Sequence, residues 1–175
     1  SQLPAATNPV SVGAVVPIVD GGVTKKATIA QLGEMVSVKA YGATGDGTTN
    51  DTAAIQAAID YVYGAGGGTV YFPPGTYRVT SIVRNWTNPI TVNIKGSGKR
   101  STVLRKFGSD ATPVLDFSGI ASMLEPYSEI SDLEIDGNDV GNVNGLRATN
   151  YGRWVLRNVF IENCNYGLYC RGGLV

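Results

Sequence analysis

The most conspicuous absence in this sequence of 175 residues is histidine, which does not occur once. A Ser-His-Asp triad is therefore excluded, and so is the side chain most often used as a general base or metal ligand. The formal net charge is zero, so the sequence lacks the positive surplus of a typical nucleic-acid or anionic-membrane binder. No apolar run approaches the roughly 20 residues that cross a bilayer, and we expect neither nucleic-acid binding nor membrane insertion.

Cysteine is nearly as scarce, with Cys164 and Cys170 as its two examples. Two thiols without histidine make a poor zinc site. We expect packed free thiols, with a disulfide as the less favoured alternative. The glycine runs at 64–68 and 96–101 each precede a strand-like segment rather than a helix, which argues against a nucleotide loop. The sequence therefore predicts no metal and no cofactor.

Glycine, by contrast, is abundant at 23 residues, and strand-like segments separated by turn residues run from about residue 69 to the end. Two of these segments repeat 26 residues apart, so that Leu133 aligns with Val159 and Ile135 with Ile161. A second pair repeats at 22 residues and aligns Leu146 with Leu168. Short strands with a period in the twenties predict a stacked solenoid over residues 69–175.

One amphipathic helix stands out, over about residues 52–63. Asp51 or Asn50 can cap its start, and Gly64 fits the position after its end. Its apolar stripe consists of Ile55, Ala58, Ile59 and Val62.

A solenoid leaves the apolar end of its first coil uncovered. We therefore expect residues 38–68 to form a cap, with the helical stripe on the open end and Gln56 and Asp60 facing solvent. The alternative is an ordinary surface helix on an α+β domain.

Residues 1–37 differ in composition from the rest. We expect a strand in AVVPIVD (14–20), a short helix from Thr28, and a further strand in SVKAYGA (37–43). This region is too small to hold a core of its own, so it is expected to serve as a connector that needs a partner.

The order of glycine loop, Asp cap, helix and Pro-Pro-Gly turn in VKAYGATGDGTTNDTAAIQAAID and GGGTVYFPPGTY resembles the N-terminal motif of pectate-lyase-like proteins. The resemblance covers about residues 37–80 and implies an all-β fold, a right-handed parallel β-helix capped by one N-terminal α-helix. Bacteriophage tailspikes and some bacterial polysaccharide lyases and epimerases carry this motif. The preceding VVPIVDGGVTKKATIAQL looks like a connector to a virion-attachment domain, which favours a tailspike.

A tailspike resemblance implies a homotrimer in the phage tail, made in the host cytoplasm. It also implies a partner in the tail, baseplate or another tailspike on the N-terminal side, and bacterial surface polysaccharide as ligand. Many members cleave that polysaccharide, usually further along the helix. We therefore expect this piece to serve connection, capping and trimerisation, without catalysis of its own. The alternatives are a free bacterial polysaccharide lyase or epimerase, and a non-catalytic β-helix adhesin.

One pair of carboxylates is a candidate catalytic site. The 26-residue repeat places Asp136 beside Glu162 on adjacent coils, about 4.8 Å apart. Carboxylates that close suit a retaining glycosidase. The favoured interpretation is a solvated ladder of charges in which Lys95 takes the equivalent position one coil earlier.

Two further groups have open roles. Trp154, Tyr166, Tyr169 and Arg171, with the nearby Tyr151, Arg153 and Arg157, suit either a saccharide groove or a subunit contact. Asp132 and Asn158 each precede an inward apolar residue, where a β-helix bends through one left-handed residue. Because Asp and Asn tolerate that conformation, we expect a structural role rather than a sugar contact.

Overall fold

The computed structural model describes residues 15–20, 23–28, 35–83, 90–118, 128–149 and 154–171. The chain divides into two compact units, Ser1–Glu34 and Met35–Val175. In the first unit, β1 (Val15–Asp20) and β2 (Val23–Thr28) pair as antiparallel strands. The strand predicted in AVVPIVD is confirmed. The helix predicted from Thr28 falls on residues 29–34, outside the described residues, and Thr28 itself ends β2.

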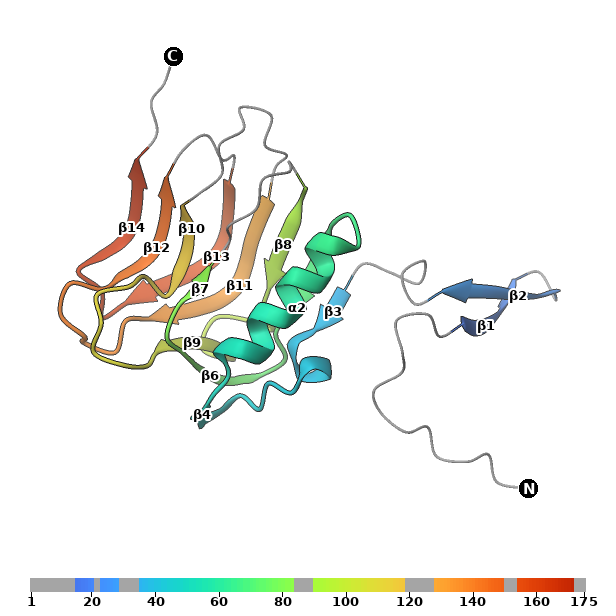
Figure 1. The fold of residues 1–175 in the computed structure, drawn as a ribbon, viewed down its shortest axis with the longest axis horizontal. Coiled ribbons are helices and arrows are strands. Elements are labelled where there is room, and N and C mark those ends of the chain that lie inside the picture. The colour runs from blue at the N-terminus through green and yellow to red at the C-terminus, as the bar shows by residue number, and fades with distance from the viewer. Residues whose placement is uncertain are drawn as a thin grey trace, which may run out of the picture. The chain divides into compact units, whose positions relative to one another are not determined.

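The second unit is a right-handed parallel β-helix (Figure 1). Its larger sheet has two halves. One half contains β3 (Met35–Ser37), β5 (Gly68–Tyr71) and β8 (Val92–Lys95), and the other contains β4 (Asp46–Asn50), β6 (Gly75–Val79) and β9 (Thr102–Lys106). The nine-residue strands β11 (Ser128–Asp136) and β13 (Trp154–Glu162) are long enough to serve both halves.

A second parallel sheet closes the other side of the coils. It consists of β7 (Ile82–Val83), β10 (Leu115–Ser118), β12 (Asn144–Thr149) and β14 (Tyr166–Arg171), paired in that order. Every pair in both sheets is parallel. The predicted stacking is confirmed in register, because Leu133 pairs with Val159, Ile135 with Ile161, and Leu146 with Leu168.

The core consists of the inward side chain at alternate positions of each strand. Val70, Ile94 and Ile130 stack on successive coils with 0–2% exposure. One inward position is instead a lysine, since Lys106 pairs with Val79 and is 0% exposed. Its ammonium donates to the carbonyl oxygens of Thr80 and Thr112 and pairs with Asp110 Oδ1 at 2.6 Å. A charge in this core is therefore tolerated because its donors are directed at oxygens, one on Thr80 of the preceding coil and the others in the turn that follows β9.

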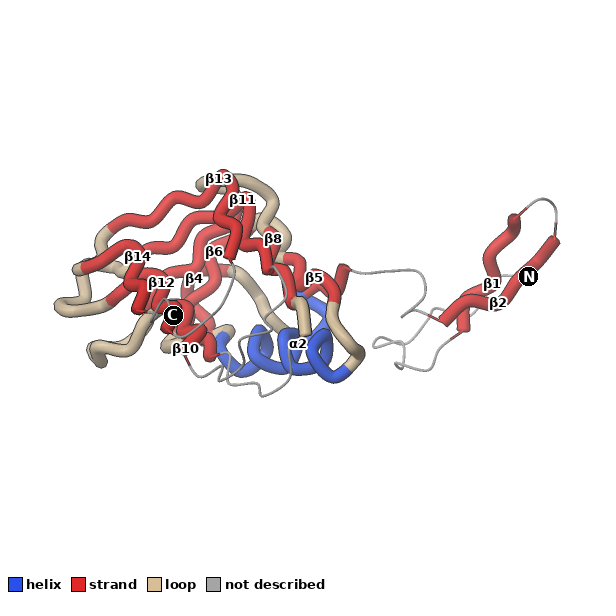
Figure 2. Tube along the Cα trace, turned by 90° about the horizontal axis from the view of Figure 1, so that it is seen from above, coloured by secondary structure: helices blue, strands red, loops and turns tan. Residues whose placement is uncertain are grey.

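The helix α2 (Thr52–Gly64) occupies a particular place in the order of the coils. Later coils run through β5, β6 and β7 and through β8, β9 and β10, whereas the first runs through β3, β4 and α2. The helix therefore stands where the smaller sheet has a strand in later coils. Figure 2 shows it beside β5 and away from β13 and β14. The predicted cap residues Ile55, Ile59 and Val62 are 0–2% exposed within the core cluster.

Side chains of α2 also complete the open edge of β7. Gln56 Nε2 donates to the Val83 carbonyl at 2.9 Å, and Gln56 Oε1 accepts from the Val83 N–H at 3.0 Å. Thr52 Oγ1 accepts from the Thr80 N–H at 2.9 Å. The expectation that Gln56 faces solvent freely was wrong, because its amide substitutes for the peptide group of a neighbouring strand and covers an exposed edge.

Asp51 precedes α2 but does not cap it through its side chain. Its carboxylate, in a residue that is 1% exposed, accepts from the backbone N–H groups of Thr44 at 2.7 Å and Gly45 at 3.1 Å. The nearby Asn50 Oδ1 accepts from the Thr52 N–H at 3.1 Å. Asp51 therefore fastens the glycine loop to the start of the helix.

Two local predictions need correction. The strand expected over 37–43 is β3 followed by the 3₁₀ helix η1 (Val38–Tyr41), which Ser37 caps and Gly42 ends at φ 96°. Gly64 is the last residue of α2, and the left-handed glycine lies two residues later at Gly66, with φ 95°. None of the helices in the described residues has the length and apolar character that a membrane crossing requires.

Covering the end of the core with α2 yields a stability prediction. Ile59→Asp should lower the free energy of unfolding by about 3 kcal/mol or more, because it places an unpaired charge among buried side chains. Ala57→Asp introduces the same group on the exposed side of the same helix and should cost no more than about 0.7 kcal/mol. Denaturant unfolding of both variants measures the difference, and equal losses would show that the helix does not cover the core.

Candidate functional site

The predicted carboxylate pair is in register, since Asp136 pairs with Glu162 across β11 and β13. The neighbour of Asp136 on the other side is Arg105 rather than Lys95, which pairs with Ser131 instead. The predicted place of Lys95 was wrong because the turn at 96–101 separates β8 from β9. The single long strand β11 pairs with β8 near its start and with β9 near its end, so Lys95 of β8 does not lie beside Asp136.

Asp136 is not a solvated charge, because only 3% of the residue is exposed. Its carboxylate accepts from Arg105 Nε at 2.7 Å, from Asn163 Nδ2 at 2.9 Å and from the Asn138 N–H at 2.8 Å. Burial alone would raise the pKa of Asp136, but these hydrogen bonds outweigh it and lower the pKa. Asp136 is therefore held as an anion and is poorly suited to donate a proton.

Glu134, two residues earlier on the same outer face, has the opposite environment. It is 6% exposed, and no residue in the described ranges forms a hydrogen bond with its Oε2. Burial, followed by the nearby carboxylates of Glu162 and Asp136, raises the pKa of Glu134. Glu134 was not predicted as a site residue from the sequence, although its place between the inward Leu133 and Ile135 puts it on the outer face with Asp136.

The smaller sheet brings together two of the predicted saccharide contacts. Asp116, Arg147 and Tyr169 lie on one register line across β10, β12 and β14, on the face opposite the inward leucines. Arg147 Nε donates to Asp116 Oδ1 at 3.0 Å, and the guanidinium also contacts Oδ2. The rings of Tyr166 and Tyr169 lie 6.2 Å apart, and Tyr166 is 57% exposed. This outer face of β10, β12 and β14 therefore offers aromatic rings beside an oriented guanidinium.

Trp154 does not belong to that face. Its ring stacks on Phe117 with centroids 4.6 Å apart and packs against the core. Arg157 lies on the larger sheet, where it donates to Glu129 at 2.8 Å. Both residues were grouped with the tyrosines because they are close in sequence, but successive strands of one coil face different directions.

Three remaining members of the predicted group are only partly located. Arg171 ends β14 in register with Thr149, and its side chain lies outside the described part, as do Tyr151 and Arg153.

Both cysteines are free as expected, although Cys170 is exposed rather than packed. Among the residues that the structure describes, no cluster of His, Cys, Asp and Glu could hold a metal ion.

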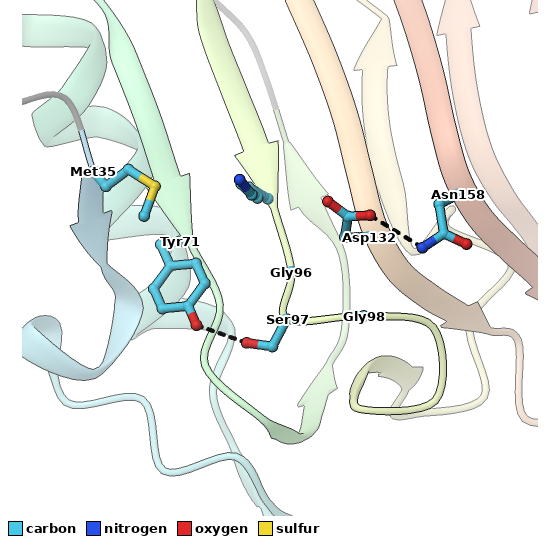
Figure 3. Close-up of a pocket in the computed structure, with 8 residues that line it drawn as sticks. Met35, Tyr71, Gly96, Ser97, Gly98, Asp132 and Asn158 are labelled. Atoms are coloured by element: carbon cyan, nitrogen blue, oxygen red, sulfur yellow. Dashed lines mark hydrogen bonds between the residues drawn. The ribbon is translucent and has the colours of Figure 1, made fainter.

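The predicted left-handed bend is confirmed at Asp132 and Asn158, whose φ angles are 58° and 52°. Asn158 Nδ2 donates to Asp132 Oδ1 at 3.0 Å, which stacks the two bends on adjacent coils. The pair lines a hollow of about 500 Å³ together with Tyr71, Lys95 and Ser97. Figure 3 shows the pair opposite Tyr71 and Ser97. Asp132 and Asn158 therefore form the bends of two adjacent coils as predicted, and the same two residues also line a pocket.

Residues 35–118 match the family described as rhamnogalacturonase A/epimerase, pectate lyase-like. The chain is 44% identical over 113 residues to mannuronan C5-epimerase AlgE2 of Azotobacter vinelandii. That alignment covers 58% of this chain and 11% of the relative, so the chain spans about a tenth of that protein.

Two solved structures extend the comparison. ORF18 of Geobacillus virus E2 superimposes with a TM-score of 0.66 and 26% identity, over 88% of this chain and 34% of the viral protein. The A-module of the A. vinelandii epimerase AlgE6 superimposes with a TM-score of 0.57 and 29% identity, over 78% of this chain and 40% of the module. The chain is thus similar to a part of longer proteins, among them mannuronan C5-epimerases and a viral protein.

The opposite environments of Glu134 and Asp136 predict opposite pH effects. A lowered native pKa contributes stability that is present above the unfolded pKa of Asp136 and is lost as the pH falls through the native value. A raised native pKa makes stability fall as the pH rises from the unfolded toward the native pKa of Glu134. Asp136→Asn should therefore lower the free energy of unfolding by about 1–3 kcal/mol at neutral pH and by less in acid. Glu134→Gln should not lower the free energy of unfolding at neutral pH, and it should reduce the change of that free energy with pH.

Denaturant unfolding of the two variants from mildly acidic to neutral pH tests both signs. The substitutions are matched, since each replaces one carboxylate by its amide on the same face of β11. A loss of stability in Glu134→Gln that grows with pH would contradict this account of the buried glutamate.

Proposed function

We infer that this chain is the N-terminal part of a phage tailspike, whose whole protein binds bacterial surface polysaccharide and depolymerises it. In this proposal, residues 1–37 connect the β-helix to the virion and take part in a homotrimer. Residues 38–68 start and cap the β-helix, and the coils from residue 69 begin the surface that contacts polysaccharide.

The extent of the viral match carries the virion assignment. The β-helix unit, Met35–Val175, is 141 of the 175 residues, or about 81%. The match to the viral ORF18 covers 88% of the chain, so it continues into the residues before Met35. The match to the AlgE6 module covers 78%, less than the β-helix unit itself. The viral protein therefore shares with this chain part of the segment to which the connector role is given.

The relatives support polysaccharide as the class of ligand, because their names include mannuronan epimerases and an alginate lyase. On this chain, the face of β10, β12 and β14 suits such a ligand. Tyr166 is an exposed ring, Tyr169 offers a hydroxyl, and Arg147 is held by Asp116 with donors in a fixed plane. These groups can orient a sugar without histidine.

The second candidate is a free bacterial polysaccharide epimerase or lyase, which the 44% identity to AlgE2 favours. The two candidates differ in location and in product. A tailspike is a component of the purified virion, whereas a free enzyme is not. A hydrolase leaves saturated oligosaccharides, a lyase leaves unsaturated ends, and an epimerase changes sugar configuration without shortening the chain.

The assembly prediction is tested on the intact protein in its natural particle. We expect antibody against residues 35–175 to label the phage tail in electron micrographs, and we expect the purified full-length protein to sediment as a trimer. A full-length protein that sediments as a monomer, or that is missing from the purified particle, would contradict the proposal.

The polysaccharide face is tested by substitution in the full-length protein. Tyr166→Ala and Tyr169→Ala should each weaken polysaccharide binding about threefold to tenfold, since each removes an aromatic contact. Phe107→Ala is the matched control, because Phe107 is 36% exposed and directly follows β9, outside this face. Equal losses in all three variants would refute the assignment of the face.

A further inference from the structure

We call the outer face of β10, β12 and β14, which carries Tyr166 and Tyr169, the tyrosine face. A second polar surface lies away from it, on the larger sheet. Tyr71, Lys95, Ser131 and Arg157 form one register line across β5, β8, β11 and β13. Thr69, Asn93 and Glu129 form a parallel line beside it. We call the outer surface formed by these two lines the Lys95 face.

Two hollows adjoin on the Lys95 face. One, of about 500 Å³, is lined by Tyr71, Ser97, Asp132 and Asn158 together with Met35. The other, of about 150 Å³, is lined by Thr69, Asn93, Glu129, Ser131 and Arg157. Lys95 lines both. Both hollows span β5, β8, β11 and β13 and follow one another along these strands, so a ligand that lies along the strand direction would pass Lys95 between them.

Lys95 is half-buried, and no described residue forms a hydrogen bond or an ion pair with its ammonium. Its neighbour Arg157 differs, since it donates to Glu129 at 2.8 Å and lies 3.6 Å from Asp132. Among the residues that the structure describes, the face thus has one cation, Lys95, without a partner and one, Arg157, that is paired with carboxylates. The Lys95 ammonium can therefore pair with one carboxylate of a bound ligand.

The other lining groups suit a polyhydroxylated ligand. Tyr71 and Ser97 share a hydrogen bond of 2.8 Å between their hydroxyls, and Asn93 Oδ1 accepts from the Glu129 N–H at 2.8 Å, which leaves the amide NH₂ to donate. Figure 3 shows Met35 and the Tyr71 ring on one side of the larger hollow and the Asp132–Asn158 pair on the other. The hollow therefore has an apolar wall and a hydrogen-bonding wall, as a sugar ring requires.

We propose that the Lys95 face binds an acidic polysaccharide, with the Lys95 ammonium paired to the carboxylate of one uronic acid. This site is separate from the tyrosine face of β10, β12 and β14, and it rests on the proposed function only for the polysaccharide as the class of ligand. It gives the coils a second contact with a glycan on a different side of the stack.

Chemical footprinting of the full-length protein tests the site directly. Acetylation of lysine by acetic anhydride is followed by mass spectrometry, with a mannuronate hexasaccharide as the probe and neutral maltohexaose as its control. We expect the mannuronate probe to slow acetylation of Lys95 several-fold and to leave Lys39, which is exposed and donates to the Thr44 carbonyl, unchanged. Maltohexaose should protect neither. Equal acetylation of Lys95 with and without mannuronate, or equal protection by maltohexaose, would overturn the proposal.

A second measurement separates this site from the tyrosine face. Protection of Lys95 should persist in Tyr169→Ala, whatever that variant does to overall polysaccharide binding, and its disappearance there would overturn the proposal. In Lys95→Gln, the mannuronate concentration that half-protects the amides of β8 from hydrogen exchange should rise about tenfold, since one charged contact is lost. Lys39→Gln, the matched control, should leave that concentration unchanged, and an equal rise in both variants would count against Lys95.

Discussion

The stacking of aliphatic side chains at one strand spacing is the interaction on which the whole β-helix depends. Val70, Ile94 and Ile130 lie over one another because each strand alternates inward and outward positions and each coil pairs in parallel with the next. Every outward side chain is then placed by the same register. The Asp116–Arg147–Tyr169 line and the Tyr71–Lys95–Ser131–Arg157 line are both consequences of how the core is stacked.

The same stacking leaves one end and one edge open, and α2 closes both. Its buried face supplies aliphatic contacts, and Gln56 supplies the two hydrogen bonds that a neighbouring strand would have supplied to Val83. Asp51 holds the preceding loop by its backbone. The loop, helix and first strands therefore form one unit, which explains why glycines, an Asp and an apolar stripe occur together in the sequence.

The sequence was sufficient to predict the β-helix, the capping helix, the pairing of Ile135 with Ile161 and the left-handed bends at Asp132 and Asn158. These features follow from local spacing, which a repeat makes visible. The sites were harder to predict, because outward neighbours come from coils of unequal length. Lys95 was assigned to the line of Asp136 because the turn at 96–101 could not be placed. Trp154 was grouped with Tyr166 although its ring packs on Phe117, and the buried Lys106 gave no signal of its enclosing oxygens.

The unequal coils have a consequence for how this architecture can change. From Val70 to Ile94, Ile130 and Leu156 the register is kept while the number of residues per coil varies, so a longer loop between strands leaves their pairing unchanged. Lengthening such a loop adds little entropic cost and moves no core side chain. The loops between strands can therefore change in length and composition while the stack stays the same, so the outer surface can be altered without altering the fold that supports it.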